Sequence, residues 1–171
     1  MSDHTHETYL GLKARILAVL DENRIMSIAT VRADGWPQVT LVGCAHDDFT
    51  LYFVIAANSQ KLSNIRREPR VSIAMGRDSS THIRGLSMAA LASVVTDFDE
   101  VERLNDLIAQ RYPARTLFAP RETSSALMRA SPTIISLIDH SKGPGQPESL
   151  VVTSHRELAD DVEYKPPPAT Q

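Results

Sequence analysis

The stretch from Leu51 to Met75 constrains the fold of this chain most, because it joins two strand patterns through one short helix pattern. Its first part, Leu51 to Ala57, is an unbroken apolar run rich in aromatic and β-branched residues, which favours a buried strand over a short helix. Ser59 is a good helix N-cap, and Pro69 ends the helix that follows. Residues 71–75 then alternate as a half-buried strand does.

The junction between the first strand and the helix has the chemistry of an anion site. The first N–H groups of a helix lack internal acceptors, and the helix dipole places partial positive charge there. Ser59 adds a hydroxyl donor, and Lys61 adds a full positive charge two residues later. Most serine N-caps only cap, and most lysines in a first turn are only solvated. These residues alone therefore leave two interpretations open, a phosphate-binding turn or an ordinary capped helix.

The order and spacing of these residues resemble those of the FMN-binding split-barrel superfamily, the pyridoxamine-phosphate-oxidase-like proteins. The matching residues around the helix are Ser59, Lys61, Asn64, Arg66, Pro69, Arg70 and Val71. Residues 28–42, with Asp34-Gly35-Trp36-Pro37 at their centre, are similar to the first hairpin of the family, and residues 135–143 resemble the closing strand of several members. The resemblance covers residues 12–152 and favours the phosphate-binding interpretation.

Hydrophobic periodicity predicts the other elements. Strands at 24–31 and 37–45 and a third from Phe49 are joined by tight turns, so these neighbours are expected to be antiparallel. The remaining predictions are helices over 7–20, 98–112 and 122–129, and strands over 86–95, 133–139 and 150–152. Small residues in and beside the strand at 86–95, such as Gly85 and Ala89, indicate close packing against a neighbour or a flat ligand.

A strand-rich pattern whose few helices do not alternate regularly with strands predicts a mainly β, α+β fold. We expect a small antiparallel barrel with peripheral helices, and the resemblance specifies it as an FMN-binding split β-barrel. One domain is predicted over residues 1–158, followed by a flexible tail over 159–171, which includes a proline run.

Charge and composition exclude several classes of function. The formal net charge of −3 gives no electrostatic reason to expect nucleic acid or an anionic membrane as partner. The single cysteine, Cys44, is expected to be a small buried residue, and the scattered histidines do not form a metal-site pattern, so no metal is predicted. No apolar run is long enough to span a bilayer, and the polar N-terminus does not resemble a signal peptide, so we expect a cytoplasmic protein.

In the family that the chain resembles, the flavin lies in a cleft between the two protomers of a homodimer. Carried over to this sequence, Ser59 and Lys61 hold the FMN phosphate with Gln60 adjacent, strand 39–42 runs along the isoalloxazine ring, and residues 54–55 line the floor of the cleft. The implied cofactor-binding set is Val39, Thr40, Leu41, Val42, Val54, Ile55, Ser59, Gln60 and Lys61. Trp36 beside the first turn is expected either as a lid on the core or, the favoured alternative, as an aromatic at an interface or pocket rim.

The resemblance implies an FMN-dependent oxidoreductase with an unidentified small-molecule redox substrate. The flavin supplies the redox chemistry, so we expect no catalytic acid–base pair. True pyridoxamine-phosphate oxidase is disfavoured, because the basic C-terminal signature of that enzyme around Trp, Arg and His is missing. Two alternatives stay open: an empty barrel with a stress or interaction role, or a non-catalytic carrier of a flavin, a deazaflavin or haem. His140 or His155 would be the candidate haem ligand.

Overall fold

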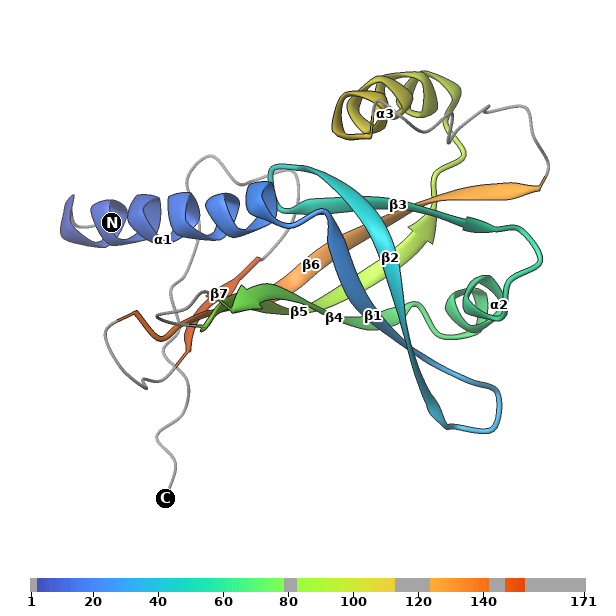
Figure 1. The fold of residues 1–171 in the computed structure, drawn as a ribbon, viewed down its shortest axis with the longest axis horizontal. Coiled ribbons are helices and arrows are strands. Elements are labelled where there is room, and N and C mark those ends of the chain that lie inside the picture. The colour runs from blue at the N-terminus through green and yellow to red at the C-terminus, as the bar shows by residue number, and fades with distance from the viewer. Residues whose placement is uncertain (1–2, 79–82, 113–123, 142–146, 153–171) are drawn as a thin grey trace.

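The computed structural model describes residues 3–78, 83–112, 124–141 and 147–152 (Figure 1). The elements in these residues follow one another as α1 (Asp3–Glu22), β1 (Ile25–Val31), β2 (Pro37–Asp47), β3 (Thr50–Ala56), α2 (Gln60–Arg67), β4 (Arg70–Asp78), β5 (Ile83–Val94), α3 (Phe98–Arg111), β6 (Ser125–Asp139) and β7 (Glu148–Val151). The expected C-terminal tail and His155 lie outside the described residues.

Antiparallel strands form a closed barrel. The hydrogen-bonded order is β3-β2-β1-β4-β5-β6-β7, and β3 also pairs with β6. In this closing contact, residues 51–56 of β3 run antiparallel to residues 125–130 of β6. Closure gives the backbone of β3 partners along both edges, as a buried strand requires. The predicted mainly β, antiparallel split barrel with peripheral helices is confirmed.

The interior of the barrel holds the main hydrophobic core, and helices close it. Leu12, Ile16 and Leu20 of α1 join this core, as do Leu62 and Ile65 of α2. Figure 1 shows α1 and α2 at opposite ends of the barrel. The third helix, α3, packs outside the barrel wall, in a smaller cluster formed by Tyr52, Val95 and Leu104. Among the described residues, no helix is long and apolar enough to cross a membrane.

The first hairpin forms where the sequence predicts it. In β1, Met26, Ile28 and Thr30 are buried and alternate with more exposed neighbours. The turn that follows contains Gly35 with φ of 83°, a conformation that glycine adopts without strain, and its N–H donates to the carbonyl of Arg32 at 2.9 Å. The hairpin therefore follows from local alternation and turn chemistry.

The predicted short helix over 122–129 is wrong where the structure describes it, because residues 125–129 begin the long strand β6. These residues pair with β3 on one side and with β5 on the other. A tertiary requirement therefore overrides a local helix preference, since β3 would otherwise leave one backbone edge unpaired. Pro132 does not interrupt the strand either, because it lies at a β-bulge opposite Ala90, where a missing N–H is tolerated.

Two consecutive residues at the end of α3 attach this helix to the rest of the molecule. The Arg111 Nη2 group donates to the carbonyls of Leu20, Asp21 and Asn23 at 2.8, 2.7 and 3.0 Å, and so satisfies carbonyls at the C-terminal end of α1. The Tyr112 hydroxyl donates to the carbonyl of Cys44 at 3.0 Å. These bonds attach the end of α3 to the end of α1 and to β2.

Candidate functional site

The predicted anion site lies where β3 ends and α2 begins. Ser59 is the N-cap of α2, and its Oγ accepts a hydrogen bond from the Leu62 N–H at 3.2 Å, so the predicted cap is confirmed. The Ser59 hydroxyl hydrogen remains able to donate to a ligand. The N–H groups of Gln60 and Lys61 have no acceptor within the helix, because they belong to its first turn. The turn therefore offers one hydroxyl and two backbone donors to an anion.

Lys61 is the charged residue of this turn, and its side chain is buried. Its exposed fraction is only 9%. Burial lowers the pKa of its ammonium group, because removal from water disfavours the charged form. No carboxylate of the described residues forms an ion pair with it, and desolvation is the sole cause of the shift. A buried cation without a counter-ion is unfavourable in the free protein and is typical of a site that binds an anion.

Asn64 connects the start of α2 to the barrel wall. Its side-chain Nδ2 donates to Thr30 Oγ1 at 3.0 Å and to Gln38 Oε1 at 3.1 Å, and its Oδ1 accepts from Gln60 Nε2 at 2.9 Å. Gln38 directly precedes the strand segment at 39–42. The structure therefore brings the predicted phosphate turn and the start of the predicted ring-binding segment together. Sequence reasoning included Asn64 in the family pattern but assigned it no role.

The strand segment at 39–42 has two faces. Val39 and Leu41 are 63% and 72% exposed and point out of the barrel. Thr40 and Val42 pair with buried residues of β1 and lie on the inner face. The Oγ1 atom of Thr40 is buried and has no hydrogen-bond partner in the described part of the protein. A flat ligand on the outer face of β2 would meet Val39 and Leu41, whereas Thr40 shares the inner face with Gln38.

Val54 and Ile55 lie on opposite sides of β3. Ile55 is part of the main core, and Val54 is half-buried in a position paired with Leu127 of β6. The structure therefore gives the two residues different surroundings, and only Val54 retains exposed side-chain area. Cys44 is buried as expected, and burial raises the pKa of its thiol to about 11, so it stays protonated at neutral pH.

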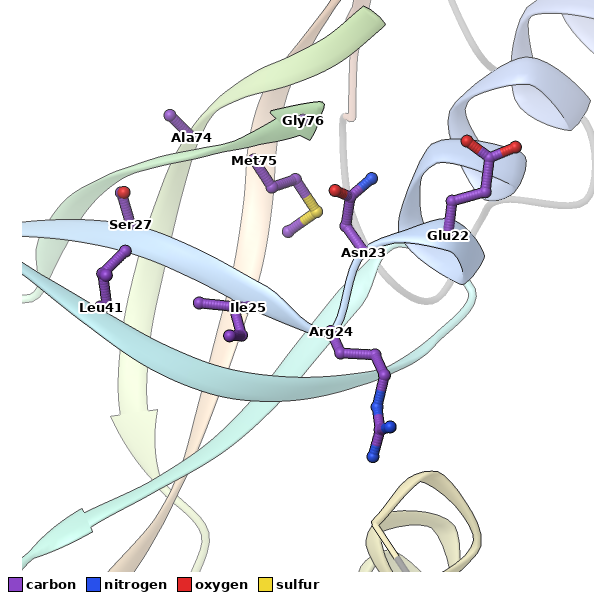
Figure 2. A pocket seen from close by; sticks show the side chains of 9 residues that line it. All are labelled: Glu22, Asn23, Arg24, Ile25, Ser27, Leu41, Ala74, Met75 and Gly76. Atoms are coloured by element: carbon purple, nitrogen blue, oxygen red, sulfur yellow. The ribbon is translucent and has the colours of Figure 1, made fainter. Parts of the chain in front are cut away.

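A hollow of about 420 Å³ lies on the outer face of β1, β2 and β4 (Figure 2). Its lining residues are Glu22, Asn23, Arg24, Ile25, Ser27, Leu41, Ala74, Met75 and Gly76. Leu41 is the member of this set that the sequence had singled out. The others escaped sequence reasoning, although the exposed apolar Ile25 and the small Ala74 stand at outward positions of their alternating strands.

Polar groups from the segment after α1 border this hollow. Glu22 is held by ion pairs with Arg77 at 3.2 Å and Arg84 at 3.4 Å. Arg24 turns away from the hollow, as Figure 2 shows, and its guanidinium lies 4.4 Å from the centre of the Tyr112 ring. The hollow therefore combines apolar side chains from three strands with a polar border whose charges are already engaged.

Taken together, these residues fit a phosphorylated flavin. The buried Lys61 side chain, with its positive charge, and the open donors of the α2 turn suit a phosphate group. The exposed apolar face of β2 and the adjoining hollow suit one side of a flat aromatic ring. Among the described residues, no group of His, Cys, Asp and Glu side chains could hold a metal ion.

Comparison with known proteins agrees with this geometry. The family described as pyridoxamine 5'-phosphate oxidase matches residues 12–139. General stress protein 26 of Bacillus subtilis is 33% identical over 67 residues, which are 39% of this chain and 47% of that protein. This match therefore spans less than half the length of the curated relative.

Solved structures share the fold over most of the chain. General Stress Protein 26 from Bacillus anthracis str. Sterne is 25% identical, with a TM-score of 0.64 over 82% of this chain and 98% of that one. The haem storage protein HutZ from Vibrio cholerae is 22% identical, with a TM-score of 0.61 over 71% of this chain and 89% of that one. Because the family match extends from α1 to the end of β6, this chain belongs to the pyridoxamine 5'-phosphate oxidase family.

Proposed function

We propose that this protein is an FMN-binding oxidoreductase that acts on a small-molecule redox substrate and holds its flavin between the two protomers of a homodimer. The observation that carries the proposal is the buried Lys61 at the N-terminus of α2, whose ammonium group has no ion-pair partner among the described residues. The phosphate of FMN supplies the anion that this group lacks. Family membership supports the same conclusion, because the family is named after pyridoxamine 5'-phosphate oxidase, an enzyme that oxidises a phosphorylated compound.

Each part of the site has a separate task in this proposal. Lys61 and the Ser59 hydroxyl bind the phosphate, together with the open N–H groups of the α2 turn. The outer face of β2, with Val39 and Leu41, orients the ring and excludes water from one side of it. A bound flavin supplies hydride and electron transfer, so the protein itself needs no catalytic acid–base pair.

An apolar surface on the β1–β2 hairpin supports the dimer. Its large exposed apolar side chains are Ile25, Val31, Trp36, Val39 and Leu41. Apolar side chains gathered in this way mark interaction surfaces in soluble proteins, and Trp is enriched at such interfaces. A flavin ring lying on β2 would be covered on one side only by a single chain. A second copy of the chain would cover the other side and bury the hairpin surface.

The proposal is tested by the visible spectrum of the purified protein and by titration with FMN, riboflavin and haemin. We expect a flavin spectrum with maxima near ~370 and ~450 nm, and binding of FMN at least about tenfold tighter than binding of riboflavin, since only FMN carries the phosphate. The FMN-loaded protein is then mixed with NADH or NADPH, and we expect bleaching of the flavin band.

Other outcomes of these titrations would point to other functions. A Soret band with no affinity for flavins would contradict the proposal and favour a haem-binding protein. Tight FMN binding without reduction by any common donor would instead favour a non-catalytic flavin carrier. A protein that binds neither flavin nor haem would contradict both.

Leu41→Glu tests the dimer. A carboxylate at this position cannot be buried without a partner, so we expect the dimer to dissociate and FMN affinity to fall at least about tenfold in the same variant. Light scattering after size-exclusion chromatography gives the mass, and fluorescence titration gives the affinity. Leu10→Glu on the exposed face of α1 is the control and should change neither. A monomeric wild-type protein, or an intact Leu41→Glu dimer with normal affinity, would contradict the proposed cleft.

A further inference from the structure

We propose that Asn64 is a positioning residue of the phosphate site. On this view, it holds the first turn of α2 against β1 and β2 and thereby sets where the Lys61 ammonium lies relative to the ring-binding strand. The inference rests on the function proposed above. It goes beyond that function, because it assigns specificity for the phosphate to a residue that does not touch the ligand.

The contacts of Asn64 carry this inference. Its side chain is 1% exposed, and it bridges three elements through hydrogen bonds to Thr30 of β1, Gln38 of β2 and Gln60 of α2. Both N–H donors of the amide are used, and its oxygen accepts a bond as well. A buried amide that is satisfied in this way has one favourable orientation, so it resists rotation or sliding of the helix start.

The same contacts change the role of Gln60. Its side-chain nitrogen donates to Asn64 rather than remaining free for a ligand. Lys61 is then the source of full positive charge among residues 59–61. When one ammonium group supplies the charge, the strength of phosphate binding depends strongly on where that group lies, because charge interactions in a buried site weaken with distance. Gln60 therefore acts through Asn64.

Other contacts anchor α2 to the barrel without the Asn64 side-chain amide. Leu62 and Ile65 bury their side chains in the main core, and Ser59 caps the N-terminus. The C-terminal end is held separately, because the Glu68 N–H donates to the Asn64 carbonyl at 2.8 Å, a backbone bond that substitution of the side chain leaves in place. The side-chain amide therefore fixes the orientation of the helix relative to β1 and β2, whereas apolar contacts hold the helix on the barrel.

The test is the ratio of riboflavin to FMN dissociation constants, which reports the phosphate site separately from the ring site. We expect Asn64→Ala to lower this ratio at least about fivefold, because a misplaced ammonium group should lose affinity for phosphate by about the net contribution of one hydrogen bond. Ile65→Val is the matched control, because it weakens packing of the same helix without touching the amide network. Ile65→Val should lower thermal stability about as much as Asn64→Ala does, but it should leave the ratio of dissociation constants unchanged.

Gln60→Ala provides a second route to the same answer, because Gln60 is exposed and its loss should not impair folding. We expect it to lower the ratio, and we expect Asn64→Ala with Gln60→Ala to be no worse than Asn64→Ala alone. Additive effects would show that Gln60 acts independently and would overturn the inference. A wild-type protein without preference for FMN would overturn the proposed function, whereas a preserved preference in both single variants would overturn the positioning role alone.

Discussion

Lys61→Met should lower the affinity for FMN at least about thirtyfold and, at the same time, raise the free energy of unfolding of the flavin-free protein by about 0.5–1 kcal/mol. The two effects have one cause. Lys61 as a residue is 9% exposed, and its ammonium group has no carboxylate partner among the described residues. Without an anion it is a buried, uncompensated charge, whereas methionine has a similar length and no charge to desolvate.

Lys13→Met is the matched control for this experiment. Lys13 forms an ion pair with Asp48 at 2.9 Å, and its ammonium lies 5.3 Å from the centre of the Phe49 ring. The same substitution there removes favourable interactions, so stability should fall slightly and FMN affinity should not change. Urea unfolding of the apo proteins and flavin fluorescence measure the two quantities. A destabilised Lys61→Met variant with normal FMN affinity would show that Lys61 has a structural role only.

The pH dependence follows from the same burial. Burial lowers the pKa of Lys61 below its ordinary value of 10.5, so the charged form is the one that folding disfavours. The destabilisation of the apo protein is therefore fully present below the lowered pKa, and it is relieved progressively as the pH rises from that pKa to the ordinary value of 10.5. Phosphate binding requires the charged form, so wild-type affinity for FMN should fall over that same range. This fall should disappear in Lys61→Met.

Gly85→Ala should lower the free energy of unfolding by about 1–3 kcal/mol, because a methyl group there has no space. A Cβ atom on Gly85 would lie 2.6 Å from the carbonyl oxygen of Met75 and 3.2 Å from the Cα atom of Gly76. Both neighbours are backbone atoms of β4, so no side-chain rotation can relieve the overlap. Gly76 and Gly85 are paired across β4 and β5, and each allows the close approach of the other strand.

Gly11→Ala is the control, because a Cβ atom there meets nothing within 4 Å and the residue lies within α1. Alanine is favoured over glycine inside a helix, so this variant should be stabilised by about 0.5–1 kcal/mol. Urea unfolding compares the three proteins. Equal stability of Gly85→Ala and the wild type would mean that the strands separate more easily than their geometry indicates.

The sequence left two interpretations of the small residues around β5 open, close packing or a flat ligand. For Gly85 the structure decides in favour of close packing, since the neighbouring backbone of β4 occupies the space that a side chain would need. Sequence alone could not make this choice, because the pairing of Gly85 with Gly76 is set by the register of β4 and β5.

Local patterns were sufficient for several features. The Ser59 cap, the Asp-Gly turn at Gly35 and the burial of Cys44 were each predicted from a few neighbouring residues and are confirmed. The helices α1 and α3, expected over residues 7–20 and 98–112, were also predicted from apolar spacing. These features depend on hydrogen bonds and burial within one element, which spacing along the sequence records directly.

Contacts between segments that are distant in the sequence could not be predicted from local patterns. The start of β6 was predicted as a helix, because nothing in its local sequence reveals that β3 needs a partner there. The division of the segment at 39–42 into an outer and an inner face became clear only once β2 was paired with β1.

The sequence by itself determined most of the elements and the cap and charge of the proposed phosphate turn, because capping, charge and periodicity are local properties. Only the tertiary structure decided that the Lys61 side chain is buried with no counter-ion in the described part of the chain, and that Asn64 joins α2 to two strands. Asn64 bonds to Gln38 and Thr30, which lie 26 and 34 positions away in the sequence. Such contacts, like burial, depend on how the barrel closes, and closure is a property of the whole chain.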